Sequence, residues 1–425
     1  MSTHRVLLLT TAHSYRNEPF QRAAGRLDIE VILGIDAVQP PVRVQPGRLA
    51  LDFNRVGAAA SAIVEFAHTH SLDAILAADD SGVVLAAEAA GRLGLVHNSP
   101  QAAQAARDKY VMRSLMAAAG VPCPWFRTFS TADDLESVAA SVPYPCVVKP
   151  LNLNASRGVM RADGRCELVA AIQRLARILD AAGVDDDTGS AHRAHPFLVE
   201  AFIPGIEVAL EGILDDGELT VLALFDKPDP LDGPFFEETI YVTPSRLPDD
   251  VQAAIAASAG QAARAIGLRT GPIHAELRVN ENGPWLLEVA GRSIGGLCGQ
   301  TLRFEMDMSL EELILRQACG LPWRGVRRNA QATGVMMIPI PEAGILREVE
   351  GLDAAAAVPG VENVEITAAR HHTLLPLPEG DSYLGFIFAR GETPAAVERA
   401  LRAAHKQLRF HIVPEFIIMQ GPAAS

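Results

Sequence analysis

The chain has 425 residues, of which 49% are hydrophobic and 21% are charged, and its formal net charge is −14 at pH 7. This composition is typical of a folded globular protein and excludes a disordered or fibrous chain. A chain of this length is expected to form about two to four domains. The negative charge disfavours nucleic acids and anionic membranes as partners, but it is compatible with a local basic pocket for a small ligand.

The five cysteines show no C-x-x-C spacing, and the twelve histidines show no H-E-x-x-H spacing. These absences indicate reduced thiols and argue against a zinc or other transition-metal site. No apolar run reaches the ~18 residues that a membrane span requires. The apolar run near the N-terminus is too short for a secretory signal and is typical of a buried first strand. We therefore expect a cytoplasmic protein.

The first hundred residues alternate between short apolar runs and helical patterns, which predicts a parallel sheet with crossover helices. Strands are expected at 5–9, 29–33 and 74–78, and helices at 18–26, 57–70 and 83–93. Asp79-Asp80-Ser81-Gly82 follows the third strand at its carboxyl end, where open α/β sheets bind ligands. The first strand is not followed by G-x-G-x-x-G, so the sequence does not support a dinucleotide site.

The rest of the chain predicts two further domains, 101–325 and 326–425, after an N-terminal domain of residues 1–100. A polar stretch, Gly183–Pro196, is expected to be a mobile surface loop. Helices are expected at 101–120, at 166–182 and from Ser309 to Gly320, and strands at 146–150, 197–203, 206–213, 219–225, 334–340 and 382–390.

The stretch 274–292 is the most informative and predicts a two-stranded hairpin around Asn-Gly. Alternation puts His274, Glu276 and Arg278 on one face of the first strand. If the loop comprises three residues, 281–283, Glu276 stands directly opposite Glu288, with Cβ atoms roughly 5 Å apart, where like charges repel. A cation between the two carboxylates would remove this conflict, and Mg²⁺ prefers such oxygen ligands. Two solvated glutamates on an exposed face remain the alternative.

Further candidate residues precede the hairpin. Lys149 ends an apolar strand and is followed by a loop of small residues; the two could hold phosphates by charge and by backbone N–H groups. No P-loop motif is present, and a surface turn is the alternative. Glu200 ends a buried strand, where the backbone of Ala201 and Phe202 could meet an adenine edge. Glu207 starts the next strand, and rim carboxylates are the alternative for both glutamates.

Two segments add candidates for substrate contacts. Lys227 begins a segment rich in proline and glycine that ends near Glu238, and we expect a shaped loop over a pocket; a plain surface loop is the alternative. Arg292 is followed by Ser-Ile-Gly-Gly, which places a cation beside pliable backbone. A phosphate or carboxylate clamp is expected there, with an ordinary arginine before a glycine turn as the alternative.

The order of these motifs resembles the ATP-grasp superfamily. Asp108-Lys109 before a helix, Lys149 with its loop, and Glu200 with Glu207 lead up to the hairpin and Arg292. The Lys-Pro-x-Pro-Leu-x-Gly-Pro-Phe-Phe-Glu-Glu-Thr segment and the Glu-Val-Ala-Gly-Arg ending look like the carboxylate–amine ligases that include bacterial L-amino-acid (dipeptide) ligases. The resemblance covers roughly residues 1–415. It implies an α/β fold, with α+β grasp domains between an N-terminal parallel α/β domain and a small C-terminal α/β domain.

The resemblance also implies residue roles. Glu276 and Glu288 would bind Mg²⁺, with Mn²⁺ as an alternative ion, and Arg292 would steady an acyl phosphate. Glu238 would lie near the amine substrate and is the best candidate for a general base. ATP would be bound by Lys109 and Lys149 (phosphates), Ser156, Arg157 and Gly158 (covering loop), Glu200, Ala201 and Phe202 (adenine), Glu207 (ribose) and Lys227. One departure is Ala290, where many ATP-grasp enzymes have a metal-binding Asn; this leaves the number of Mg²⁺ ions open.

The activity implied is ATP-dependent amide formation between a carboxylate and an amine, with amino acids as the expected substrates, through an acyl phosphate with release of ADP and phosphate. Positioning and charge neutralisation would supply most of the catalysis. The alternatives are a carboxylase-type ATP-grasp enzyme that activates bicarbonate, and a non-catalytic ATP-binding module. Neither a nucleic acid nor a membrane is expected as a partner, and a homodimer is the default expectation for the assembly.

Overall fold

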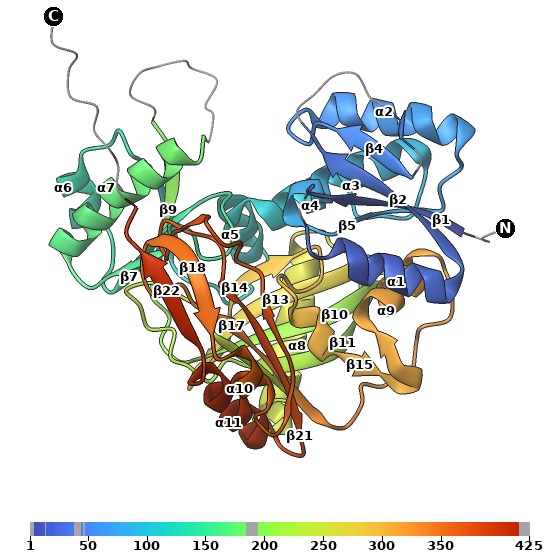
Figure 1. Cartoon of the computed structure of the whole chain (residues 1–425). Helices are drawn as coiled ribbons and strands as arrows, with labels where there is room; N and C mark the ends of the chain where they lie inside the picture. Colours follow the sequence, from blue (N-terminus) through green and yellow to red (C-terminus); the bar gives the residue numbers. More distant parts are fainter. Residues whose placement is uncertain (1–3, 13, 38–43, 46, 184–193, 416–425) are drawn as a thin grey trace, which may run out of the picture. The chain divides into compact units, whose positions relative to one another are not determined.

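The computed structural model describes residues 4–12, 14–37, 44–45, 47–183 and 194–415. Figure 1 draws the helices and strands in colours that follow the sequence. The chain divides into two compact units. The first comprises Met1–Thr128, Glu200–Pro230 and Thr243–Gln331, and the second comprises Phe129–Val199, Leu231–Val242 and Ala332–Ser425. The three-domain division expected from the sequence stays a prediction. Most of the expected mobile loop at Gly183–Pro196 lies outside the described residues.

The N-terminal sheet has the strand order β3-β4-β2-β1-β5. Strands β2, β1 and β5 are parallel, as predicted. The strand β4, which was not predicted, is parallel to β2, and the short β3 is antiparallel to β4. Leu7 and Leu9 of β1 pack into a core with Ile63 and Leu85 from two covering helices. The elements are β1 (His4–Thr10), β2 (Ile29–Asp36), β3 (Val44–Gln45), β4 (Arg48–Leu51), β5 (Ala74–Ala77), α1 (Asn17–Leu27), α2 (Val56–Thr69) and α3 (Asp80–Leu93).

The single helix predicted over 101–120 is two helices, α4 (Pro100–Arg107) and α5 (Lys109–Ala118). The break is at Asp108, whose backbone is extended and whose side chain accepts hydrogen bonds from the N–H groups of Tyr110 and Val111. An Asp that caps a new helix competes with the continuous helix because its side chain satisfies the first N–H donors. Lys109 therefore occupies the first turn of α5.

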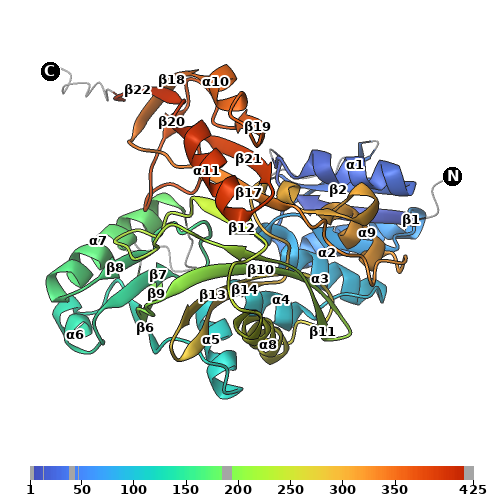
Figure 2. The ribbon, with the colours of Figure 1, turned by 90° about the horizontal axis from the view of Figure 1, so that it is seen from below.

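The first unit also contains four antiparallel strands in the order β14-β13-β10-β11. Helix α8 packs on one face of these strands (Figure 2), and its buried Ile255, Ala259 and Ala263 share a core with Leu277 and Leu286. The elements are β10 (Ile206–Asp215), β11 (Glu218–Asp226), α8 (Asp249–Ala265), β13 (Gly271–Asn280) and β14 (Gly283–Ala290).

A connecting region completes the first unit. It comprises η1 (Cys298–Thr301), β15 (Arg303–Phe304), η2 (Glu305–Asp307), β16 (Met308–Ser309) and α9 (Leu310–Ala318). Helix α9 begins at the predicted Ser309 cap, where Ser309 and Glu312 form a reciprocal capping box. Arg26 of α1 binds both carboxylate oxygens of Glu312, which ties the two helices together.

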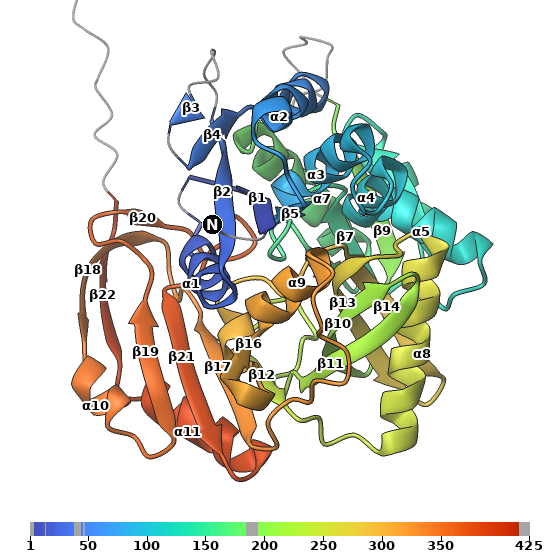
Figure 3. The same cartoon turned by 90° about the vertical axis from the view of Figure 1, so that its right-hand side faces the viewer.

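The second unit contains a sheet with the order β6-β9-β7-β8 and the C-terminal strands β17, β21 and β19. Helix α7 covers the first sheet with Leu168, Ile172 and Leu175, and α11 packs on β17 and β21 (Figure 3). A small sheet has the order β20-β18-β22. The elements are β6 (Phe126–Ser130), α6 (Leu135–Ala140), β7 (Cys146–Pro150), β8 (Met160–Ala162), α7 (Arg165–Ala181), β9 (Pro196–Ala201), β12 (Ile240–Thr243), β17 (Ala332–Ile338), β18 (Gly344–Glu350), α10 (Leu352–Ala356), β19 (Val361–Ile366), β20 (Thr373–Leu374), β21 (Gly385–Gly391), α11 (Pro394–His405) and β22 (Arg409–Val413). Within the described part of the chain, no helix combines the length and the apolar character that a membrane crossing requires.

Candidate active site

The hairpin of β13 and β14 places Glu276 directly opposite Glu288, as predicted. The loop that connects the two strands is shorter than the three residues that we expected. Only Glu281 and Asn282 connect the strands, and the register shifts between Glu276 and Leu277. The extra residue is thus accommodated by a bulge, which commonly re-aims side chains next to functional sites.

Both facing carboxylates keep access to solvent, with side-chain exposures of 24% for Glu276 and 34% for Glu288. Two carboxylates at this separation are suited to a divalent cation that retains several waters, as Mg²⁺ does. Lys227 Nζ lies 3.6 Å from Glu276 Oε1, and Lys109 Nζ lies 4.0 Å from Glu288 Oε2. The donor set therefore fits a divalent cation bound together with an anionic ligand. Ala290 is buried opposite His274 and offers no ligand atom.

A row of alternating acidic and basic side chains lies along the paired strands β10 and β13 of the first unit. Glu207 faces Arg278 across the two strands, and its carboxylate is 3.0 Å from Arg278 Nε and 2.9 Å from Lys227 Nζ. Lys227 in turn reaches Glu276. Because every carboxylate in this part of the row contacts a cation, the charges can be buried at a tolerable cost. Arg278 also lies 4.7 Å above the ring of Phe202.

The row continues at His274, which lies between two carboxylates. Its Nδ1 is 3.3 Å from Glu211 Oε2, and its Nε2 is 3.4 Å from Glu276 Oε1. Burial alone would lower the pKa of His274, but the hydrogen bonds to Glu211 and Glu276 raise it to about 9. The ring is therefore an imidazolium at neutral pH and donates from both nitrogens. Burial also raises the pKa of Glu211, and the cationic ring opposes this shift.

Arg292 lies just beyond β14 and is held by two contacts within the first unit. Its Nη2 is 2.7 Å from Asp80 Oδ2, and its Nη1 donates to Ser293 O at 2.9 Å. Burial alone would raise the pKa of Asp80, but the Arg292 guanidinium lowers it below its usual range. Asp80 belongs to the segment that we expected to bind ligands at the carboxyl end of the third strand. In this structure Asp80 fixes the orientation of the Arg292 guanidinium.

Glu200, at the end of β9, is almost fully enclosed and pairs with Arg113 of α5 at 2.7 Å. Arg113 also donates to Leu287 O, and this bond links α5 to β14. The N–H of Ala201 donates to Trp125 O at 2.8 Å. The adenine contacts expected for Glu200, Ala201 and Phe202 stay predictions. The structure adds Arg113 as the ion-pair partner of Glu200.

The remaining candidates lie in the second unit. Lys149 lies in β7, and the expected covering loop with Ser156, Arg157 and Gly158 connects β7 to β8. Gly158 has φ = 73°, and a Cβ there would lie 2.8 Å from Leu175 Cδ1, so only glycine fits without strain. Its N–H donates to Pro378 O at 2.9 Å.

In the same loop, Arg157 Nη1 lies 3.5 Å from Asp381 Oδ2. Two loop residues, Arg157 and Gly158, therefore contact the segment before β21. The Pro/Gly-rich segment after Lys227 is held against β8 by a bridge between Phe235 and Met160 and by Arg161, whose Nη1 donates to Asp232 O. Glu238 accepts a hydrogen bond of 2.8 Å from the Tyr241 hydroxyl.

Three residues of the candidate site were missed by reading the sequence: Glu211, Arg113 and Arg16. Glu211 is four residues after Glu207 on the same strand, so alternation puts both on one face, a signal that was available. Arg113 is likewise one helical turn after Lys109. Arg16 had no local signal, because its bonds to Ala78 O and to Ser293 join segments far apart in the sequence.

Comparisons with known proteins match two parts of the chain. An ATP-grasp domain matches residues 142–301, and an L-amino acid ligase C-terminal domain 2 matches residues 336–413. Together with the fold, these matches place the chain in the ATP-grasp superfamily. Within it, the chain belongs to the carboxylate–amine ligases, and the resemblance seen in the sequence is confirmed.

Solved structures show the same likeness. The L-amino acid ligase from Bacillus licheniformis superimposes with a TM-score of 0.81 at 25% identity, and the match covers 98% of this chain and 100% of that one. A carboxyaminoimidazole ribonucleotide synthase from Aspergillus clavatus, complexed with ATP, matches 96% of this chain and 100% of that one with a TM-score of 0.70. At 17% identity, the second match shows the fold alone.

Among curated relatives, the alanine–anticapsin ligase of Bacillus subtilis is 29% identical over 270 residues, which is 60% of this chain and 56% of that enzyme. The match therefore spans little more than half of that relative. An uncharacterized protein of Sinorhizobium fredii is 26% identical over 394 residues, 88% of this chain and 79% of that protein.

Proposed function

We propose that the chain is an ATP- and Mg²⁺-dependent ligase that joins the carboxylate of one amino acid to the amine of another. The observation that carries this proposal is the facing pair Glu276–Glu288, which has Lys109 and Lys227 beside it in an ATP-grasp fold. Nucleotide binding alone does not require two facing carboxylates. The names of the alanine–anticapsin and L-amino acid ligases support amino acids as substrates.

The reaction would run in two steps. A substrate carboxylate oxygen attacks the γ-phosphorus of ATP, and the bond to the bridging oxygen breaks, which gives an acyl phosphate and ADP. The amine nitrogen of the second substrate then attacks the acyl carbon, loses a proton and expels inorganic phosphate. The chain itself needs to supply positioning and charge neutralisation.

Residues of the first unit would share this work. Glu276 and Glu288 would hold the divalent cation, which neutralises phosphate charge. Lys109 would neutralise phosphate oxygens, and Arg292, which Asp80 orients, would stabilise charge on the acyl phosphate. Glu200 and Glu207, with Ala201 and Phe202, would position the nucleoside, and Lys227 would complete the ATP contacts.

Lys149 and the loop with Ser156, Arg157 and Gly158 would contact the phosphates. Because Arg157 contacts Asp381 and Gly158 N–H contacts Pro378 O in this structure, those bonds would be exchanged for phosphate contacts during the reaction. Glu238, which accepts the Tyr241 hydroxyl, would receive the proton of the amine.

The test is a screen of paired amino acids for ADP release that depends on Mg²⁺, with mass detection of the condensed product. At least one pair should stimulate ADP release with one phosphate and one amide formed per turnover. A bicarbonate-dependent ADP release without an amine would favour the carboxylase alternative. ATP binding without stimulated ADP release by any pair would favour a non-catalytic binding module.

A further inference from the structure

Glu211 is a buried charge that the proposed reaction does not use. It lies on β10 opposite His274 of β13, and its side chain is fully buried. Its Oε2 accepts the N–H of Ile294 at 2.9 Å and lies 3.3 Å from His274 Nδ1. Its Oε1 has no hydrogen-bond partner among the residues that the structure describes. One oxygen of this carboxylate therefore holds two segments that are far apart in the sequence, and the other oxygen is left unsatisfied.

Stability alone does not account for Glu211. A buried carboxylate oxygen without a donor is costly, and such groups are rare in folded proteins. A buried ion pair can often be replaced by apolar side chains of similar size without loss of stability. A charge that breaks the rules of a well-packed core is expected where function requires it. The reason for the pair of Glu211 and His274 is therefore expected in the site that the pair adjoins.

The strand pairing is irregular at both carboxylates that flank His274. The register of β10 with β11 shifts directly after Glu211, and that of β13 with β14 shifts directly after Glu276. Such bulges bend the paired strands and commonly re-aim side chains next to functional sites. A Cβ at Gly212 would lie 2.9 Å from Thr220 O, so the close approach of the strands beside Glu211 requires glycine. The backbone is thus built to direct both carboxylates.

On one side, Glu211 reaches the facing pair of glutamates through His274. The second ring nitrogen of His274, Nε2, is 3.4 Å from Glu276 Oε1. A ring that is bonded at both nitrogens has a fixed orientation, so the placement of Glu276 depends on Glu211. Groups that orient a metal-binding residue in this way commonly contribute about 10- to 100-fold to metal affinity or activity.

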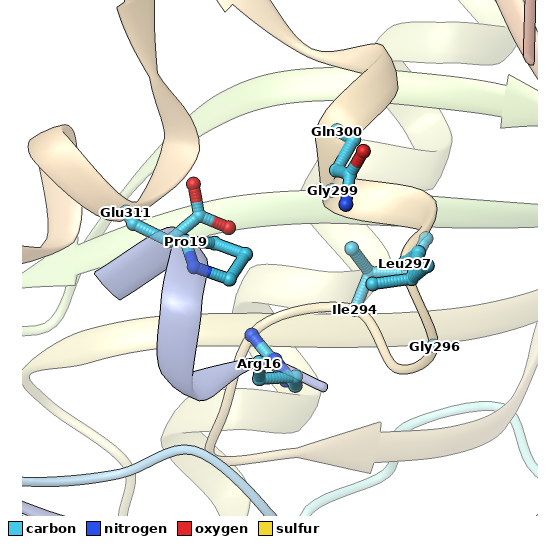
Figure 4. A pocket seen from close by; sticks show the side chains of 8 residues that line it. All are labelled: Arg16, Pro19, Ile294, Gly296, Leu297, Gly299, Gln300 and Glu311. Carbon is cyan, nitrogen blue, oxygen red and sulfur yellow. The ribbon is translucent and has the colours of Figure 1, made fainter. Parts of the chain in front are cut away.

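On the other side, Glu211 reaches the loop that carries Arg292. Its partner Ile294 lies two residues after Arg292, and Arg292 Nη1 donates to the O of the intervening Ser293 at 2.9 Å. Arg16 fixes the same loop by donating to Ser293 Oγ, and Arg16 and Ile294 line one small pocket (Figure 4). The backbone that orients Arg292 is therefore held in part by Glu211.

We propose that Glu211 is a positioning residue that keeps the cation-binding Glu276 and Arg292 in register with each other. The inference rests on the proposed ligase function, in which the cation and Arg292 neutralise charge on the same phosphoryl group. Glu211 acts through His274 and Ile294 and touches neither the nucleotide nor a substrate. Its loss should therefore weaken cation binding and slow turnover, whereas the contacts to the nucleoside remain.

The test compares Glu211→Met, which removes both acceptor oxygens at similar length, with Glu211→Gln, which keeps one. Electron paramagnetic resonance measures binding of Mn²⁺ to the full chain with a non-hydrolysable ATP analogue. Glu211→Met should weaken this binding by about tenfold or more and lower kcat by a similar factor. The KM for ATP should stay nearly unchanged. Glu211→Gln should recover part of both losses, because its oxygen can still accept the N–H of Ile294.

Glu312→Met is the matched control, because Glu312 is also buried and binds Arg26 and the N–H of Ser309 outside this network. It should lower the melting temperature without a change in Mn²⁺ affinity or kcat. A purely structural Glu211 would behave in the same way as Glu312.

Two double variants complete the test. Glu211→Met/His274→Leu replaces the buried pair by apolar side chains of similar size, so it should fold as stably as the wild type even if Glu211→Met does not. Its Mn²⁺ affinity should still fall by about tenfold. Glu211→Met/Arg292→Lys should lose less kcat than the product of the two single losses, because Glu211 acts through the loop of Arg292. Circular dichroism melting of each variant checks that the fold is retained.

Stimulated ADP release with wild-type Mn²⁺ affinity and kcat in a folded variant without Glu211 would overturn the inference and leave the ligase proposal standing. Multiplicative losses of kcat in Glu211→Met/Arg292→Lys would overturn the connection to Arg292. Weakened Mn²⁺ binding in Glu211→Met, in a chain whose ADP release no amino-acid pair stimulates, would instead support the positioning of Glu276 and refute the ligase proposal.

Discussion

Glu211 and His274 face each other on β10 and β13, with Glu211 Oε2 3.3 Å from His274 Nδ1. The same carboxylate oxygen accepts the N–H of Ile294, and the other ring nitrogen of His274 reaches Glu276. The fully buried carboxylate of Glu211 thus connects the loop after Arg292, through His274, to the facing pair Glu276 and Glu288.

His274→Gln should destabilise the first unit by about 3 kcal/mol at pH 7, because it leaves Glu211 buried without its cation. The pKa of His274 is raised to about 9. Because folding raises this pKa, protonation of His274 stabilises the fold fully below the unfolded pKa of about 6.5. This stabilisation is lost as the pH rises through about 9. The stability advantage of the wild type should therefore shrink between pH 7 and pH 9.5.

Urea unfolding in the presence of EDTA at these two pH values measures this advantage. His411→Gln is the control, since His411 pairs with Glu350 at an exposed site. An advantage that stays constant or grows toward pH 9.5 would contradict a cationic His274.

Glu288→Gln should reduce Mg²⁺-dependent ADP release below about one per cent of the wild type, because the facing pair would lose one charged ligand. The melting temperature should change little, since Glu288 is 34% exposed. Stopped assays for ADP and thermal melting check both points. Retained turnover in a folded variant would count against the metal assignment.

Arg113→Met should destabilise the protein by about 3–5 kcal/mol, because Glu200 would remain buried without its partner. Arg22→Met is a matched control that breaks an exposed pair with Glu18 and should cost at most about 1 kcal/mol. Urea denaturation measures both. Similar costs for the two variants would mean that the Arg113–Glu200 pair contributes no more than a surface ion pair.

Arg292→Lys should lower kcat for amide formation by roughly a hundredfold and leave the KM for ATP nearly unchanged. The reason is that a lysine cannot bond Asp80 and Ser293 O from two nitrogens at once while it also contacts a substrate. Steady-state kinetics with varied ATP and varied amino acids separates these effects. A large rise in the KM for ATP with unchanged kcat would place Arg292 with the nucleotide instead of the acyl phosphate.

The sequence by itself determined those features that depend on local periodicity and on the order of motifs. Alternation put His274, Glu276 and Arg278 on one face, the hairpin put Glu276 opposite Glu288, and the Ser309 cap marked the start of a helix. These features were predictable because each depends on residues close together along the chain, or on a turn whose length allows few registers.

Only the tertiary structure decided which distant side chains meet. Asp108 divides the helix predicted over 101–120, and a bulge in the hairpin takes the place of the expected third loop residue. Arg113, Glu211 and Arg16 bind partners that are 62 to 277 residues away in the sequence. Periodicity assigns a side chain to a face, but only the packing of strands and helices decides which charges share a buried space.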